Sequence, residues 1–175
     1  TFTSSGGGAP VVVSGLGNGT TSVNLTSLGD GTITAAVSVT DTAGNTGTGT
    51  GDTSVKDTVA PTAATINAVA TDDIINAAER TATVTVTGTN EAGATVTLNG
   101  NAATVVGTTW SYNLSAAQIT AFGEGAETLN VVSTDAAGNT TSSTRNINVD
   151  TIADAAPITT VVINDGDGFI NNAEK

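Results

Sequence analysis

The side chains best suited to chemistry in this 175-residue sequence are its carboxylates. It has 16 Asp and Glu residues against four Lys and Arg, and it has no His and no Cys. The usual zinc sites, disulfides and imidazole-based catalysis are therefore excluded. Crowded carboxylates repel one another, and a hard cation with oxygen ligands relieves that repulsion. The composition thus favours calcium binding, and we expect no enzyme.

Charge and hydropathy exclude two further classes of partner. The net charge of −12 leaves no basic surface for a nucleic acid. No apolar run approaches the roughly 18 residues of a membrane span, so membrane insertion is not expected. Residues 1–20 also lack the charged start and apolar core of a signal peptide.

An internal repeat organises the chain. The phrase TDTAGNT at 40–46 returns as TDAAGNT at 134–140, and INAVATDDIINAAER at 66–80 resembles VVINDGDGFINNAEK at 161–175. These landmarks agree on a period of about 95 residues, which indicates an array of similar units. We expect residues 1–60 to be the back part of one unit, 61–156 a complete unit, and 157–175 the front of the next.

The pattern inside the complete unit is all-β. Short alternating segments separated by turns predict an antiparallel β-sandwich. We expect seven strands, at 63–69, 81–88, 94–98, 102–106, 109–114, 127–134 and 141–149, with one helical turn within 114–122. Trp110, Tyr112 and Leu114 share a strand face, which favours core packing over carbohydrate stacking.

Up-and-down alternation of these strands places nearly every carboxylate at a junction between units. We expect Asp72, Asp73, Glu79, Glu124, Asp150 and Asp154 at the pole where the chain leaves the unit. Glu91 and Asp135 fall at the opposite pole, beside Asp57 in the entering linker. The partial units repeat the pattern with Asp30, Asp41, Asp165, Asp167 and Glu174. Calcium, which takes six to eight oxygen ligands, is the cofactor that such loops suit.

One loop shares part of its spacing with an EF-hand. In NDGDGFINNAE the residues Asp165, Asp167, Gly168, Ile170 and Glu174 fit that pattern. The first ligand position would be Ile163, which cannot bind a cation. We interpret the loop as convergent calcium-loop spacing inside a β-domain.

Several phrases together resemble a known family. DDIINAAE (72–79), VTGTNEAGATVTLNG (86–100), TTWSYNL (108–114) and GEGAETLNVVSTDAAGNT (123–140) are similar to the tandem bacterial immunoglobulin-like repeats of giant RTX-type and biofilm-associated adhesins. The resemblance implies an immunoglobulin-like sandwich in a secreted protein on the bacterial cell surface. It also implies extender domains with calcium at their junctions, and it maps Asp72, Asp73, Glu79 and Asp150 onto one junction.

The leading hypothesis is therefore a calcium-stiffened spacer of a bacterial surface adhesin, which contributes to cell adhesion and biofilm formation. The alternative is a calcium-dependent carbohydrate- or ligand-binding module, which would need an exposed aromatic side chain beside the ion. The expected partners are neighbouring repeats of the same chain. Head-to-tail self-association through the complementary segments 1–60 and 157–175 is a further hypothesis.

Overall fold

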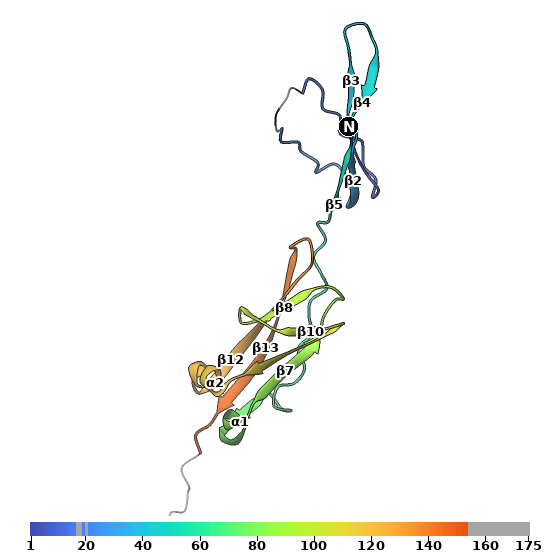
Figure 1. Cartoon of the computed structure of the whole chain (residues 1–175). Helices are drawn as coiled ribbons and strands as arrows, with labels where there is room; N and C mark the ends of the chain where they lie inside the picture. The colour runs from blue at the N-terminus through green and yellow to red at the C-terminus, as the bar shows by residue number, and fades with distance from the viewer. Residues whose placement is uncertain (17–18, 20, 154–175) are drawn as a thin grey trace, which may run out of the picture.

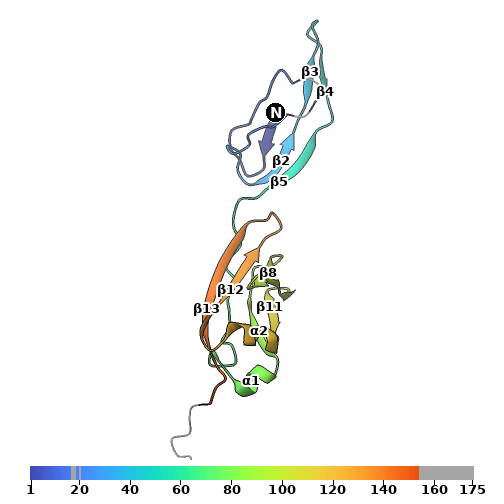
Figure 2. The same cartoon turned by 90° about the vertical axis from the view of Figure 1, so that its left-hand side faces the viewer.

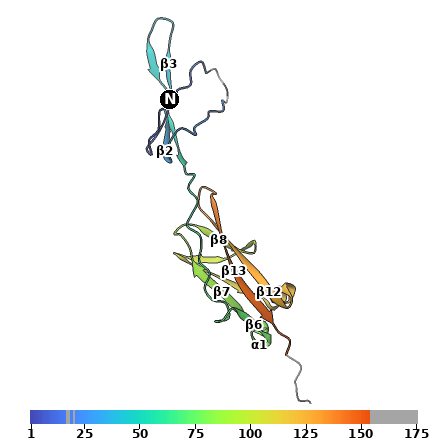
Figure 3. The ribbon, with the colours of Figure 1, turned by 180° about the vertical axis from the view of Figure 1, so that it is seen from behind.

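The chain forms two β-rich bodies arranged end to end (Figures 1 and 2). The computed structural model describes residues 1–16, 19 and 21–153. We call the body that contains strands β1 to β5, within residues 1–56, the first unit. The body that contains strands β6 to β13 and two helices, from residue 61 onward, is called the complete unit. Residues 57–62 connect the two units, and the view from behind in Figure 3 shows the same linear arrangement.

One side of the complete unit is a five-stranded sheet with the order β6-β13-β12-β8-β9. Neighbouring strands are antiparallel, except that β6 runs parallel to β13. β12 and β13 pair without interruption from Gly125 and Val149 to Thr134 and Thr140. The strands are β6 (Ile74–Asn76), β8 (Thr95–Leu98), β9 (Asn101–Ala102), β12 (Gly125–Thr134) and β13 (Thr140–Asp150).

The facing sheet has three strands in the order β10-β11-β7. They are β7 (Val84–Thr89), β10 (Thr104–Val106) and β11 (Thr109–Leu114). The predicted strand at 109–114 has the bounds of β11. The predicted strand at 102–106 is divided, because the chain crosses from one sheet to the other between β9 and β10.

The prediction of a first strand at 63–69 is wrong. This segment follows β7 through two backbone hydrogen bonds only, from Thr65 to Thr89 (2.9 Å) and from Asn67 to Thr87 (2.8 Å). Its carbonyl groups accept bonds from side chains instead of a second strand, so no regular ladder forms. The next strand begins at Val84 and not at 81, because helix α1 extends to Thr81 and residues 82–83 connect it to the strand.

Two short helices close one end of the sandwich (Figure 1). In α1 (Ala77–Thr81) the Asn76 side chain accepts from backbone amides, and Glu79 accepts from the Asn76 amide in return. This capping box explains why a helix begins after Asn76, which the periodicity did not predict. Strand β6 was also not predicted, and it forms by pairing with β13. α2 (Ala116–Phe122) lies within the predicted helical turn at 114–122. No helix among the described residues could span a membrane.

The core lies between the two sheets of the complete unit. It is aliphatic apart from one indole, and alternate residues of each strand face it. Trp110 is 2% exposed, which confirms its predicted role in the core. The buried cluster consists of Ala64, Val69, Ile75, Val84, Val86, Val96, Leu98, Trp110, Leu114, Ile119, Leu129, Val131, Ile147 and Val149.

The first unit repeats the β12–β13 ladder with an interruption. Two residues, 36 and 37, oppose three residues, 49 to 51, which is the geometry of a β-bulge. The interval from Asp41 to Asp57 is one residue longer than that from Asp135 to Asp150, so the bulge absorbs the insertion. The strands are β1 (Phe2–Ser4), β2 (Gly31–Ala35), β3 (Ser38–Thr40), β4 (Thr46–Thr48) and β5 (Asp52–Lys56).

Candidate functional site

The candidate site consists of the two ends of the complete unit. The upper pole contains the linker 57–62, the β7–β8 turn and the β12–β13 turn (Figure 1). By their positions in the sequence, Asp57, Glu91 and Asp135 belong to these three segments. The lower pole contains β6, α1, the α2–β12 connection and the end of β13. It carries Asp72, Asp73, Glu79, Glu124 and Asp150. Asp154, Asp165, Asp167 and Glu174 lie outside the described residues.

A carboxylate at the lower pole binds the first residue after β13. Glu124 accepts hydrogen bonds from both the amide of Thr151 (2.8 Å) and its hydroxyl group. Arg80 of α1 donates to the same hydroxyl oxygen at 3.0 Å. The two bonds from Thr151, first that from its side chain, lower the pKa of Glu124, and the positive charge of Arg80 lowers it further. The chain therefore leaves the unit in a direction set by Glu124 and α1.

The first unit makes the same contact at its own end. Asp30 precedes β2 as Glu124 precedes β12, and it accepts from the amide (2.9 Å) and hydroxyl (2.8 Å) of Thr58. Lys56 adds an ion pair to Asp30 at 2.8 Å. Thr58 and Thr151 each follow an Asp at or directly after the end of the last strand of a unit, in the dipeptide Asp-Thr. A carboxylate–threonine contact thus recurs at the start of both linkers.

Acidification tests the contact between Asp30 and Thr58. The bond from Lys56, followed by those from Thr58, lowers the pKa of Asp30 from 3.8 to about 2. Because this folded-state pKa is depressed, the contribution to stability is complete above 3.8 and is lost as the pH falls through about 2. We expect the Thr58 amide chemical shift, followed by NMR, to stay constant down to about pH 3 and to titrate with a midpoint near 2.

The control for this titration is Asp30→Asn, in which the low-pH transition at Thr58 should disappear. A Thr58 midpoint close to 4 in the unaltered chain, the value of an ordinary aspartate, would contradict the contact.

Three side chains of the complete unit contact the entering linker at the upper pole. Asn139 donates to the carbonyl of Asp57 at 3.2 Å, and Thr141 donates to the carbonyl of Pro61 at 2.7 Å. Glu91 accepts from the amide of Thr62 at 2.8 Å. Since Asp30 of the first unit binds Thr58, adjacent linker residues are bonded to different units. The linker is therefore fixed from both sides.

The repeated phrase TDxAGNT owes its recurrence to a turn. Asp135 accepts from the Asn139 amide (2.8 Å) and side chain (2.9 Å), and Asp41 makes the same two bonds with Asn45. The asparagine side chain is the first cause that lowers the pKa of each aspartate. In the complete unit this turn also aims Asn139 at the linker. The phrase therefore sets the geometry of a junction contact.

The acids of the lower pole have different partners. Asp73 forms a two-point ion pair with Arg145, from Nε at 2.6 Å and from Nη2 at 2.5 Å, and Arg145 is the main cause of its lowered pKa. Asp72 accepts from the amide of Ile74. Both oxygens of Asp73 are therefore engaged by Arg145, whereas one oxygen of Asp72 makes the local turn contact.

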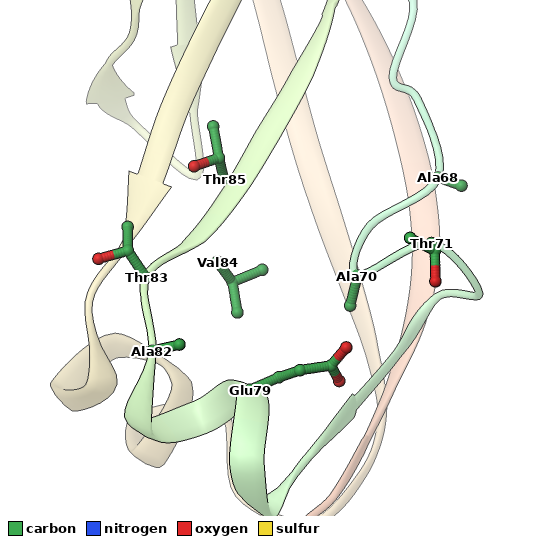
Figure 4. A pocket seen from close by; sticks show the side chains of 8 residues that line it. All are labelled: Ala68, Ala70, Thr71, Glu79, Ala82, Thr83, Val84 and Thr85. Atoms are coloured by element: carbon green, nitrogen blue, oxygen red, sulfur yellow. The ribbon is translucent and has the colours of Figure 1, made fainter.

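Glu79 and Asp150 are related through Asn76. The backbone of Asp150 pairs with Asn76, and Glu79 caps the Asn76 amide at 3.0 Å. Figure 4 shows the Glu79 carboxylate extending from α1 toward Ala70 and Thr71, into a cavity of about 310 Å³. Residues Asn76 to Ala78 and Asp150 to Ala153 line a separate groove beside it.

The donor set of both poles suits calcium in kind. Among the described residues, no three Asp or Glu side chains form a metal site by themselves. Calcium also accepts amide and backbone carbonyl oxygens, which the turns supply. The amide oxygen of Asn90, beside Glu91, is buried without a hydrogen-bond partner in the described part of the chain. An ion or a water molecule would satisfy such an oxygen.

The aromatic side chains give no support to carbohydrate stacking. Phe2, Tyr112 and Phe122 are half-buried, and Trp110 is buried. The Tyr112 hydroxyl accepts from Gln118 at 2.7 Å. No aromatic side chain in the described residues is exposed beside a carboxylate pole. Phe169 lies outside those residues.

Sequence reasoning missed the partners of the acids. Thr58, Thr151, Asn139 and Arg145 determine which carboxylates are already bonded. One signal was available, because the Asp-Thr dipeptide recurs after the last strand of each unit. No local signal links Asp73 with Arg145, which is 72 residues away.

Comparison with solved structures gives several similar chains, three of which are described below, whereas no family model and no curated protein matches. The first is a Ca²⁺-stabilised adhesin that helps an Antarctic bacterium reach out and bind ice. It is 38% identical over 71% of this chain and 33% of its own, with a TM-score of 0.41. The second, from work on host cell surface retention of a 1.5-MDa bacterial ice-binding adhesin, is 35% identical over 71% and 43%, with a TM-score of 0.39.

The third is a bacterial immunoglobulin-like domain from the M. primoryensis ice-binding adhesin. It is 36% identical, and the match covers 53% of this chain and 100% of that domain, with a TM-score of 0.38. The match covers only about a third of the length of the first structure and less than half of the length of the second. The TM-scores are too low for an argument from superposition, so the sequence identity across the whole third domain carries the comparison.

Proposed function

This chain belongs to the family of bacterial immunoglobulin-like domains represented in the M. primoryensis adhesin, and we propose that it is an extender segment of a bacterial surface adhesin. Its role is mechanical and not enzymatic: it holds a distal binding region away from the cell surface. Cell adhesion and biofilm formation are the processes to which such a spacer contributes. Its location is extracellular, at the bacterial cell surface.

The observation that carries this proposal is the double attachment of the linker 57–62. Asp30 of the first unit binds Thr58, while Asn139 of the complete unit binds the adjacent Asp57 carbonyl. A short linker without such contacts would let neighbouring domains move independently. The recurrence of the threonine contact at Glu124 and Thr151 supports the same arrangement at the next junction. An array built in this way has fixed angles and an extended shape.

Calcium is the proposed stiffening ion at both poles. At the lower pole, Asp72, Glu79 and Asp150 offer carboxylate oxygens, and Asp154 lies in the following linker. At the upper pole, Asp57 lies in the entering linker, and Glu91 and Asp135 lie in the two turns beside it. Asp73 and Glu124 are already bonded to Arg145 and Thr151, so their role at the pole is to hold the neighbouring segments in place. In the next unit the corresponding acids are Asp165, Asp167 and Glu174.

The physical reason for an ion at these positions is the net charge of −12. Carboxylates from adjacent units repel one another across a junction unless a cation neutralises them. Calcium tolerates six to eight oxygens in flexible geometry, whereas magnesium needs a stricter octahedron. A bound calcium ion would therefore neutralise the repelling carboxylates at a pole, because they would all coordinate the same ion.

Removing calcium should both destabilise the chain and make it less extended. A ligand that binds only the folded state contributes about 3 kcal/mol when its concentration is 100 times its Kd. We expect chelation to lower the Tm in calorimetry and to shorten or broaden the distance distribution in small-angle X-ray scattering. Identical melting and scattering curves in calcium and in chelator would rule out the calcium role.

A matched pair of variants assigns the effect to a pole. Asp150→Asn should weaken calcium binding in isothermal titration calorimetry and leave the fold of the complete unit intact. Asp52→Asn removes the same charge from β5, away from both poles of the complete unit, where the carboxylate accepts a hydrogen bond from the adjacent Thr53 amide. This control should bind calcium as the unaltered chain does. Equal loss in both variants would show that net charge, and not the pole, determines binding.

A further inference from the structure

We propose that residues 61–76 and strand β13 form a shear lock, by which the complete unit resists tension applied along the chain. The inference rests on the proposed extender role, because a spacer between a cell and its target is pulled from both ends. The lock consists of a parallel contact between the segment that enters the unit and the strand that leaves it. Its bonds join groups of this unit alone.

The entering segment lies between the edges of the two sheets. Its amides bond to β7 of one sheet, through Thr65 and Asn67. Its carbonyls accept from side chains of β13 in the other sheet: Ser143 donates to Ala64 at 2.5 Å, and Arg145 donates to Ile66 at 2.9 Å. The segment is therefore bonded to both sheets at once.

The donors on β13 form a regular row. Thr141, Ser143 and Arg145 are half-buried and point to the same side of the strand, because alternate residues share a face. They bond to Pro61, Ala64 and Ile66 in the same chain order, so the two segments run parallel. Ser142 and Thr144 face the opposite side and are exposed.

The contact continues to the lower pole. The amide of Asn148 donates to the carbonyl of Asp73 at 2.8 Å, and β6 then pairs in parallel with residues 148–150. Arg145 also forms the ion pair with Asp73. The bonds therefore extend over nearly the whole of β13, from Thr141 to Asp150.

Parallel direction determines how these bonds respond to force. Tension pulls the entering segment upward at residue 60 and pulls β13 downward at residue 151. Two parallel segments pulled at opposite ends slide past one another, so all the bonds between them are loaded together. If both segments are pulled at their upper ends, the bonds break one after another. The natural direction of tension is thus the one in which the lock is strongest.

Single-molecule pulling on the full chain compares these two directions. The sequence has no cysteine, so engineered pairs give unique attachment points. Ala60→Cys with Ile152→Cys loads the lock in shear, and Ala60→Cys with Ala137→Cys peels it from the upper pole. All three positions are exposed. We expect a higher unfolding force for the first pair at the same loading rate, whereas equal or reversed forces would overturn the proposal.

Two serine variants on one strand test the residues of the lock. Ser143→Ala removes the donor to Ala64, and Ser142→Ala removes the same hydroxyl group from the opposite face. At fixed force in the shear direction, Ser143→Ala should unfold about fivefold faster, as expected for the loss of one net hydrogen bond. Ser142→Ala should leave that rate unchanged. Equal rates in the two variants would overturn the assignment of the row.

Measuring in chelator separates this inference from the calcium proposal. The shear and peel forces should differ without calcium, because every bond assigned to the lock joins two groups of the protein. A loss of this difference would reject the lock and leave the calcium-dependent shape of the array as a separate result. Conversely, scattering curves that are identical with and without calcium would reject the proposed role of calcium and would not bear on the lock.

Discussion

Replacing Trp110 with alanine should lower the free energy of unfolding of the complete unit by about 3–5 kcal/mol. The indole is 2% exposed and is the largest side chain of a core that is otherwise aliphatic. Its Nε1 also donates to the carbonyl of Thr65 at 3.0 Å. The substitution leaves a cavity and removes a bond that holds the entering segment. Urea unfolding followed by circular dichroism measures the loss.

Trp110→Phe divides this effect into its two causes. Phenylalanine keeps most of the buried area but has no donor for the part-buried carbonyl of Thr65, and the loss of one such hydrogen bond costs about 1 kcal/mol. We therefore expect a loss clearly smaller than that of the alanine variant. A phenylalanine variant as unstable as the alanine variant would show that the hydrogen bond, and not the packing, dominates at this position.

Gly88→Ala should destabilise the same unit by about 3 kcal/mol, toward the upper end for an overpacked position. Gly88 pairs with Trp110 across β7 and β11. A Cβ atom at Gly88 would lie 1.9 Å from the Thr65 carbonyl oxygen and 2.7 Å from the indole nitrogen. The alanine therefore has to push the entering segment away from β7. Trp110 is the single tryptophan, so its fluorescence follows the unfolding of this unit in urea.

The control for this variant is Gly47→Ala on β4. Nothing lies within 4 Å of a Cβ atom built there, and the backbone is not in the left-handed region. The same chemical change should therefore alter stability little. If Gly88→Ala were as mild as Gly47→Ala, the close approach of Thr65 to β7 would not constrain that position.

Local patterns in the sequence determined the strands that pair in simple hairpins. Strand β11 lies where the alternation of Trp110, Tyr112 and Leu114 predicts it, since alternate residues of any strand face opposite sides. The short helix α2 follows a serine cap and a glutamine three residues later, which is also a local signal. The repeat and the position of acids in turns are likewise read directly from the residues.

The segment 63–69 shows what local patterns cannot determine. Its alternation resembles that of a strand, but its carbonyls are bonded by Ser143 and Arg145, nearly 80 residues later. Such bonds depend on which sheet edges meet once the sandwich closes. The parallel pairing of β6 with β13 has the same origin.

For the carboxylates too, local sequence determines some properties and the tertiary structure determines others. The sequence by itself determined that aspartates such as Asp41 and Asp135 occur in turns, because Asp, Asn and Gly favour those conformations. Only the tertiary structure decided that Arg145 engages Asp73 and that Thr151 engages Glu124, while the side chain of Asp150 makes no such pair among the described residues. Turn preference is set by neighbouring residues within a few positions. Charge pairing depends on the distance between two side chains in space. That distance is established only when the two sheets pack, so it cannot be read from the sequence.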